Sequence, residues 1–274
     1  MENSFYHKLR SQWVRGKFVC VGLDPVLEKI PKSAKRATAK DTVVAFNEAI
    51  IKETCDIVCA YKPNMAFYAS YEDGFKALQE TICIINDYAP HVPVILDGKR
   101  TDISKSNDGY VIEAFDILNA DAVTVNPYLG REALKLFLER EDRGIIPLCK
   151  TSNPGSGEFQ DLVVNGKPLY QHVAQNVADE WNENGNCSLV VGATFPEELH
   201  QVRQIIGDMP ILIPGIGTQG GDLKKTVAAG KDSQRMGMII NSSSGIIFAS
   251  SGEDFPQKAR EKTKALNDAI LKCR

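Results

Sequence analysis

Short apolar runs rich in β-branched residues recur along the chain, and most of them end in a polar or charged residue. Runs of this kind are typical of strands that are buried on both faces of a parallel sheet. They predict eight strands, over residues 18–23, 57–61, 94–99, 122–125, 145–149, 188–191, 211–213 and 238–240. Apolar residues at helical spacing predict intervening helices, including 42–53, 75–88, 131–139, 169–181 and 257–271.

Eight strand–helix units in 274 residues predict a (β/α)8 TIM barrel that forms one domain over residues 1–274. The alternative is a doubly wound open sheet, which usually carries a glycine-rich dinucleotide turn after its first strand. Here that turn reads Gly22-Leu23-Asp24-Pro25, which favours the barrel. A helical extension over about residues 1–16 is expected to cover the barrel floor or to pack outside it.

Composition narrows the possible functions. The net charge is −3 and lysines and arginines form no basic cluster, so nucleic-acid binding is not expected. No apolar run approaches the roughly 20 residues that span a bilayer, and residues 1–10 lack the apolar core of a signal peptide, so we expect a cytoplasmic protein. The seven cysteines and four histidines are scattered without ligand spacing, which argues against a metal site, a disulfide framework and a nucleophilic cysteine.

The strongest chemical signal lies at the end of the third predicted strand, in Asp97-Gly98-Lys99-Arg100-Thr101-Asp102-Ile103. Alternate residues of a strand share a face, so Asp97 and Lys99 should project together. The cluster is either a structural ion pair at a strand exit or part of a catalytic site. Active sites of these barrels lie at the carboxyl ends of the strands, which favours catalysis.

Other strand ends carry polar groups that would converge on the same face. Asp24, Lys62, Ser152, Gly217 and Ser244 all lie on or just after a predicted strand end. The segment 214–222, Pro-Gly-Ile-Gly-Thr-Gln-Gly-Gly-Asp, predicts a phosphate site, because glycines let backbone N–H groups approach an anion closely. Residues 151–166 predict a long loop on this face, either a lid over the site or a surface insertion.

Taken together, these motifs resemble the orotidine 5'-monophosphate decarboxylases. The resemblance runs from Gly22-Leu23-Asp24 through Tyr61-Lys62-Pro63-Asn64 to the region after Asn241, and Thr151-Ser152-Asn153-Pro154-Gly155-Ser156-Gly157 is similar to the longer bacterial branch. It implies cofactor-free, metal-free conversion of orotidine 5'-monophosphate (OMP) to uridine 5'-monophosphate (UMP) and CO2 in pyrimidine biosynthesis.

The resemblance also implies roles for single residues. Lys99 would protonate C6 within a charge network of Asp97, Lys62 and Asp102, and Asp102 would complete the site of the neighbouring subunit in a homodimer. The substrate-binding residues that it implies are Asp24, Ile103, Ser106, Ser152, Pro214, Gly217, Gln219 and Ser244.

The chain departs from this family where Ser244 stands at the position of a phosphate-binding arginine. A charge-assisted hydrogen bond contributes about 1.5–3 kcal/mol and a neutral one about 1 kcal/mol, so we expect weaker phosphate binding. Ser106 keeps the hydroxyl of a usual threonine, which is a minor change. The alternatives are a sugar-phosphate aldolase or epimerase, which would usually need a metal, and a nucleotide-binding barrel with impaired turnover.

Overall fold

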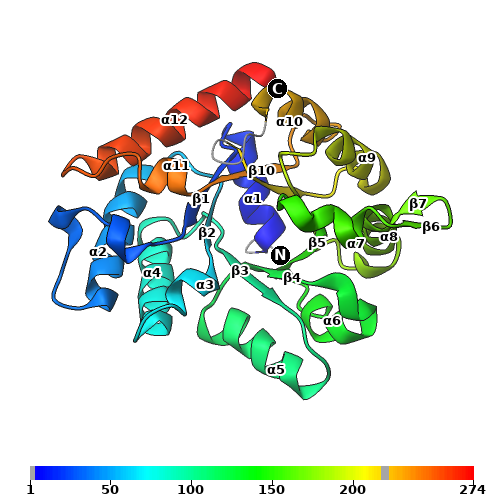
Figure 1. Cartoon of the computed structure of the whole chain (residues 1–274), viewed down its shortest axis with the longest axis horizontal. Helices are drawn as coiled ribbons and strands as arrows, with labels where there is room; N and C mark the ends of the chain where they lie inside the picture. Colours follow the sequence, from blue (N-terminus) through cyan, green and yellow to red (C-terminus); the bar gives the residue numbers. More distant parts are fainter. Residues whose placement is uncertain (1–3, 217–221) are drawn as a thin grey trace.

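The computed structural model describes residues 4–216 and 222–274, in which eight parallel strands form a barrel surrounded by helices (Figure 1). In sheet order the strands are β2 (Ala60–Pro63), β1 (Val19–Leu23), β10 (Met238–Ser242), β9 (Ile211–Pro214), β8 (Leu189–Val191), β5 (Gly144–Lys150), β4 (Ala122–Val125) and β3 (Ile95–Arg100). Parallel bridges from Tyr61 to Val94 and from Asn64 to Asp97 join β2 to β3 and close the ring. The (β/α)8 prediction is confirmed.

The longer helices follow the strands in alternation and pack outside the barrel (Figure 1). They are α2 (Ala39–Thr54), α4 (Gly74–Tyr88), α5 (Lys105–Val111), α6 (Gly130–Leu138), α8 (Leu169–Asn176), α9 (Pro196–Ile206), α10 (Leu223–Gly230) and α12 (Phe255–Cys273). Short helices α3 (Met65–Tyr68), α7 (Gly157–Gln160) and α11 (Ser244–Ile247) follow β2, β5 and β10. No helix in these described ranges is long and apolar enough to cross a membrane.

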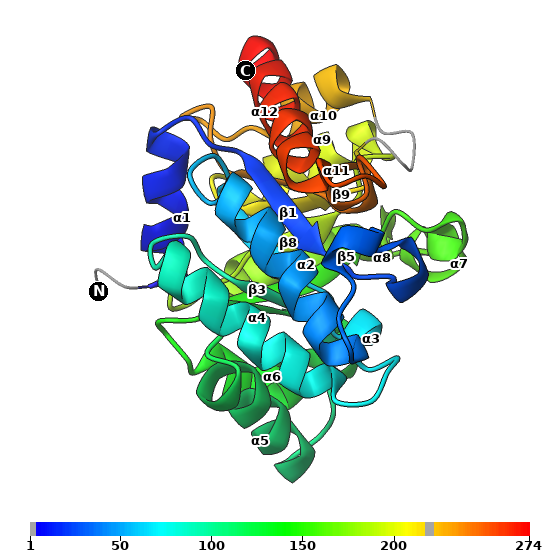
Figure 2. The same ribbon diagram turned by 90° about the vertical axis from the view of Figure 1, so that its left-hand side faces the viewer.

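Helix α1 (Phe5–Val14) lies at one end of the barrel, opposite α7 (Figure 2). The Trp13 indole donates to the carbonyl of Met238 at 2.8 Å, and Lys8 forms a 2.7 Å ion pair with Asp121. Met238 begins β10 and Asp121 directly precedes β4, so α1 packs against the amino ends of the strands. The opposite end, where the strands finish, is left for the site.

Three local predictions need correction. The second strand was expected over 57–61, but Ile57 belongs to the turn that leaves α2, where its N–H donates to the carbonyl of Thr54, and β2 begins at Ala60. The helix expected over 169–181 is α-helical only to Asn176 and continues as the π-helix η6 (Val177–Trp181). The first region still contains the predicted strand, which begins later than expected. The second still contains a helix, which changes its hydrogen-bond spacing after Asn176.

The third correction concerns 151–166, which was expected to be a structureless loop. It contains the 3-10 helix η5 (Pro154–Ser156), α7 and β6 (Val163–Val164), and β6 pairs with β7 (Lys167–Pro168), which follows directly after the segment. The hairpin turn is Asn165-Gly166, and both residues have positive φ, as a tight two-residue turn requires. The segment therefore has a defined structure of its own at the carboxyl end of β5.

Candidate functional site

A line of three alternating charges lies at the carboxyl ends of β2 and β3. The Lys62 ammonium is 2.9 Å from Oδ2 of Asp97, and the Lys99 ammonium is 2.7 Å from Oδ1 of the same carboxylate. One carboxylate thus holds two lysines from neighbouring strands. The structure brings these three predicted residues together.

The backbone reason for this convergence differs from the expected one. Lys99 has φ +46°, and the register between β3 and β4 shifts between Leu96 and Arg100, so the strand is irregular here. The Lys99 N–H donates to the Thr124 hydroxyl at 3.0 Å instead of to a strand carbonyl. A bulge of this kind redirects side chains, and here it directs Lys99 toward Asp97. Simple i, i+2 alternation along a regular strand is therefore the wrong explanation.

The three charges differ in their access to solvent. The side chains of Lys62 and Asp97 are 5% and 11% exposed, whereas that of Lys99 is 49% exposed. Burial by itself lowers the pKa of Lys62, but the charges of Asp97 and Asp24 outweigh it and the pKa rises above its ordinary value. Burial by itself raises the pKa of Asp97, but Lys62 and Lys99 outweigh it and hold the pKa well below its ordinary value. Lys62 and Asp97 are therefore both ionised at neutral pH.

Two residues of this network were missed in the sequence. The Thr124 hydroxyl donates to Oδ1 of Asp97 at 2.9 Å, and the Asn64 amide donates to Oδ2 at 3.3 Å. Thr124 lies in β4, where a threonine is an ordinary strand residue and gives no signal. Asn64 lies directly after β2, and its place at a strand end could have identified it.

Two cavities meet at this network, and both are lined by Lys62, Asp97 and Pro214. We call the first, of about 380 Å³, the lysine chamber; its other lining residues are Lys99, Thr124, Leu148, Thr151, Ser152, Asn153, Gln160, Val190 and Leu212. We call the second, of about 390 Å³, the serine chamber; its other lining residues are Asp24, Val26, Lys29, Asn64, Phe67, Gly215, Ile216, Asn241, Ser242, Ser243, Ser244 and Phe248. The two chambers together can hold an elongated ligand.

The serine chamber contains unused hydrogen-bond acceptors. Oδ1 of Asp24 and Oδ1 of Asn241 are both buried without a hydrogen-bond partner among the described residues. A buried unpaired acceptor is costly, so each requires a donor from water or a ligand. A ligand with hydroxyl groups at this point can provide such donors.

Ser152 reaches the lysine chamber through close backbone packing. A Cβ placed on Gly192 would lie 2.8 Å from Cβ of Ser152 and 2.9 Å from its Cα, so only glycine fits at 192. Nearby, the Thr151 N–H donates to the Gln160 side chain at 2.9 Å, and Gln160 donates back to the Thr151 hydroxyl at 2.9 Å. The close approach to Gly192 holds Ser152 against the barrel, and the two hydrogen bonds tie the beginning of the segment to α7.

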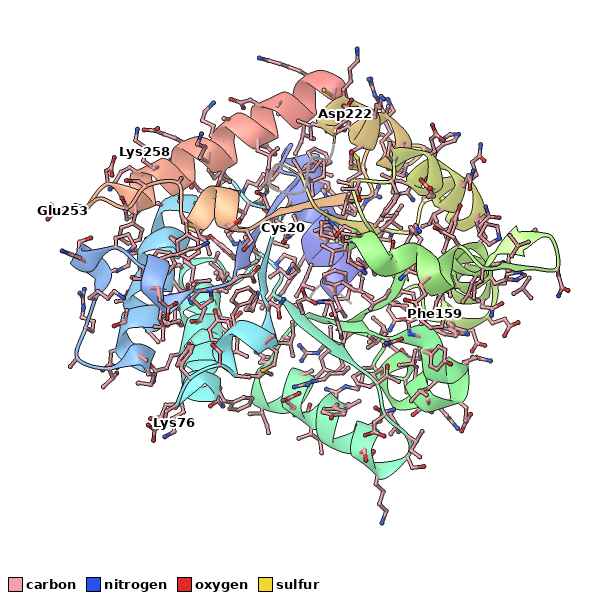
Figure 3. The ribbon with its side chains drawn as sticks, in the orientation of Figure 1. Cys20, Lys76, Phe159, Asp222, Glu253 and Lys258 are labelled. Atoms are coloured by element: carbon pink, nitrogen blue, oxygen red, sulfur yellow. The ribbon has the colours of Figure 1, made fainter. Side chains whose placement is uncertain are left out.

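Buried Lys150 also anchors that segment. Its side chain is only 1% exposed, and its ammonium lies 2.6 Å from Oδ1 of Asp161, whose side chain is 49% exposed. The same ammonium lies 4.6 Å from the centre of the Phe195 ring. Phe159, two residues before Asp161 on α7, is exposed and is labelled in Figure 3. A buried cation at the end of β5 thus holds the base of the segment, while Phe159 on α7 remains in solvent.

Other predicted residues lie apart from the two chambers or beyond the described structure. Asp102 and Ser106 line neither chamber, and Oδ1 of Asp102 accepts from the N–H of Ile103 at 2.7 Å. Ile103 also lines neither chamber, and it is 61% exposed in the single chain. Gly217 and Gln219 lie outside the described residues. Within 4–216 and 222–274, no three His, Cys, Asp or Glu side chains cluster as metal ligands would.

Comparisons with known proteins agree with this geometry. Residues 17–255 match the orotidine 5'-phosphate decarboxylase / HUMPS family. The chain is 50% identical over 271 residues to an orotidine 5'-phosphate decarboxylase of Janthinobacterium sp. (strain Marseille), covering 97% of this chain and 98% of that one. A similar protein of the same name from Cellvibrio japonicus is 48% identical, with the same coverage. The structure of Leishmania donovani OMP decarboxylase is 36% identical and superposes with a TM-score of 0.82 over 97% of this chain and 99% of that one.

Proposed function

The chain belongs to the orotidine 5'-phosphate decarboxylase family, and we propose that Lys99, held by Asp97 beside Lys62, is the group that performs the chemistry. The enzyme converts OMP to UMP and CO2 in pyrimidine biosynthesis. The observation that carries the assignment is the single carboxylate of Asp97 between two ammonium groups at the meeting point of both chambers.

The reaction breaks the bond between C6 of the pyrimidine and its carboxyl carbon. The electron pair stays on C6, CO2 leaves, and a proton must then be delivered to C6. Lys99 carries a positive charge into the lysine chamber, where it stabilises the developing carbanion and then transfers a proton from Nζ to C6. Asp97 keeps the ammonium in place through the 2.7 Å contact.

The lysine chamber also contains an apolar wall of Leu148, Val190 and Leu212. Apolar side chains lower the local dielectric, which strengthens the field of Lys99 at the reacting carbon. The substrate carboxylate enters beside the negative charge of Asp97, and the repulsion between them ends when neutral CO2 departs. Carboxylate loss therefore relieves an unfavourable contact at the same point where Lys99 stabilises charge.

The remaining contacts orient the nucleotide. Asp24 and Lys62 bind the ribose hydroxyls, consistent with the unused acceptor of Asp24, and Ser152 binds the pyrimidine amide edge. The phosphate occupies the serine chamber, with contributions from Pro214, Gly217, Gln219 and Ser244. Binding energy from these remote contacts lowers the barrier when it is expressed in the transition state.

We further propose that two copies of the chain form a homodimer in which Asp102 completes the partner's site. Asp102 lines neither chamber of its own chain, and neighbouring Ile103 and Leu129 are exposed apolar residues on one surface groove. A self-complementary apolar surface is the usual basis of a twofold dimer. The cytoplasmic location expected from the sequence stays a prediction.

Complementation tests both proposals together. Lys99→Ala and Asp102→Ala are each expected to inactivate homodimers, whereas mixing and reassociating equal amounts restores activity. Half of the dimers are then mixed, and each mixed dimer has one intact site, so about a quarter of all sites recover. No recovery, from variants shown to exchange subunits, would contradict the shared site, and an active Lys99→Ala homodimer would contradict the role of Lys99.

A further inference from the structure

The serine chamber contains a cation to which no role has yet been given. We propose that Lys29 binds the phosphate of the nucleotide and supplies the positive charge that Ser244 does not. This inference rests on the proposed placement of the phosphate in the serine chamber. It assigns a binding residue that determines affinity for the phosphorylated substrate.

The charges that line the chamber show why such a cation is needed. They are Asp24, Lys29, Lys62 and Asp97. Lys62 is already paired with Asp97 at 2.9 Å, so these two largely neutralise each other. Without Lys29, the carboxylate of Asp24 leaves the lining negative. A phosphate monoester carries about −1.5 to −2 charges at neutral pH, and a negative chamber repels it.

The position of Lys29 suits this role. It ends the 3-10 helix η1 (Leu27–Lys29), which follows β1 at the site face of the barrel. Its ammonium lies 5.9 Å from the centre of the Phe248 ring, and the Phe248 N–H donates to the carbonyl of Ser244 at 3.2 Å. Lys29 and Ser244 line the same chamber, together with the Phe248 ring that the ammonium faces. The ammonium itself faces the ring, and a cation–π contact at an exposed position is weak enough for an anion to compete with it.

Lys29 also forms no ion pair with any carboxylate of the described residues, unlike Lys62 or Lys150. An exposed ammonium directed toward a cavity can exchange water for a phosphate oxygen at little cost in desolvation. Ser244 lines the same chamber but offers only a neutral hydroxyl. Lys29 is therefore the charged partner and Ser244 at most a neutral one.

The test compares Lys29→Met with Lys29→Arg and with the control Lys32→Met. Methionine has an unbranched side chain without the charge, whereas arginine keeps the charge. Lys32 lies in the neighbouring 3-10 helix η2 (Lys32–Ala34), is exposed, and does not line the chamber. The measurements are KM and kcat for OMP, the Kd of UMP, and competitive inhibition by uridine, which lacks the phosphate.

We expect Lys29→Met to raise KM for OMP and Kd for UMP about tenfold, the effect of losing about 1.4 kcal/mol, with kcat and uridine inhibition nearly unchanged. Lys29→Arg and Lys32→Met should stay within about twofold of the parent enzyme. If Lys29→Met binds UMP as the parent does, or weakens uridine equally, Lys29 does not bind the phosphate.

Ser244→Arg separates failure of this inference from failure of the proposed phosphate site. If Ser244→Arg tightens UMP binding while Lys29→Met has no effect, the serine chamber still binds phosphate and the inference about Lys29 is wrong. If neither substitution alters the Kd of UMP, the phosphate lies elsewhere and both statements are wrong. When both act, the Lys29→Met effect should shrink in the Ser244→Arg background, because the two cations then share one phosphate.

Discussion

Replacing Asp97 by asparagine tests the charge network most severely, because it removes one charge and leaves two lysines in place. The Asp97 carboxylate accepts from Lys62 at 2.9 Å, Lys99 at 2.7 Å and Thr124 at 2.9 Å. An asparagine amide offers one acceptor oxygen, and its NH2 group faces an ammonium. Among the described residues, the carboxylate that then remains near the buried Lys62 to balance its charge is that of Asp24.

The cost follows from that burial. Removing one partner of a buried ion pair costs about 3–5 kcal/mol, because the other charge remains buried and uncompensated. At about 2–4 °C per kcal/mol for a domain of this size class, Tm should fall by about 6–20 °C. The matched control is Asp268→Asn, since Asp268 pairs with Lys264 on the exposed face of α12 and both side chains are largely exposed. That change should cost less than about 1 kcal/mol.

The pH dependence provides a second check. The pKa of Asp97 is lower in the folded protein than its ordinary value of 3.8, so its stabilisation is complete above that pH and is lost as the pH falls below it. The pKa of Lys62 is raised above 10.5, so its stabilisation persists until the pH rises above that value. The stability difference between parent and Asp97→Asn should therefore be constant from about pH 5 to 9 and narrow in more acidic solution.

Urea unfolding followed by circular dichroism, at one fixed protein concentration, measures this difference. A cost below about 1 kcal/mol for Asp97→Asn, or a difference that is as large at pH 3 as at pH 7, would refute the account of the network.

Further substitutions test other parts of the site. Gly192→Ala should raise KM several-fold, because its Cβ would lie 2.9 Å from the backbone of Ser152 and must displace it; unchanged kinetics would argue against the placement of Ser152. Asp161→Asn should destabilise more than Lys150→Met, since it leaves a buried ammonium unpaired whereas the reverse change leaves a half-exposed carboxylate; thermal melts that rank the two oppositely would contradict this. Ser244→Arg should lower KM for OMP, and equal KM values would count against the phosphate placement.

Much of the barrel follows from the sequence because its strands are buried on both faces. The run 122–125 is uniformly apolar apart from Thr124, and β4 has these same limits. The predicted ends of elements are wrong where a helix is followed closely by a strand. Ile57 has the apolar character of a strand residue, but its N–H forms a hydrogen bond in the turn after α2. The π-helical turn η6 has no distinctive composition, since only its hydrogen-bond spacing distinguishes it from an α-helix.

The part of the site that can be predicted from the sequence is the set of charged residues at the ends of strands. Asp97, Lys99 and Lys62 are ionisable residues at the ends of apolar runs, and the fold brings these ends to one face. The bulge at Lys99 depends on the Thr124 hydroxyl of the neighbouring strand, a tertiary contact that local sequence does not contain. Residue type alone does not identify a site, as Cys20 shows near the centre of the barrel in Figure 3. Its side chain is fully buried, and burial raises the pKa of the thiol to about 12, so the thiol is not a nucleophile at neutral pH.

The measurement that bears most directly on the central claim is turnover of OMP by Lys99→Ala, followed by absorbance, beside the Kd of UMP for the same variant. Loss of the proton donor and of the charge at C6 should lower kcat by at least about 10⁴-fold, while UMP binds within a few-fold of the parent. Near-normal kcat in this variant would mean that another group performs the chemistry.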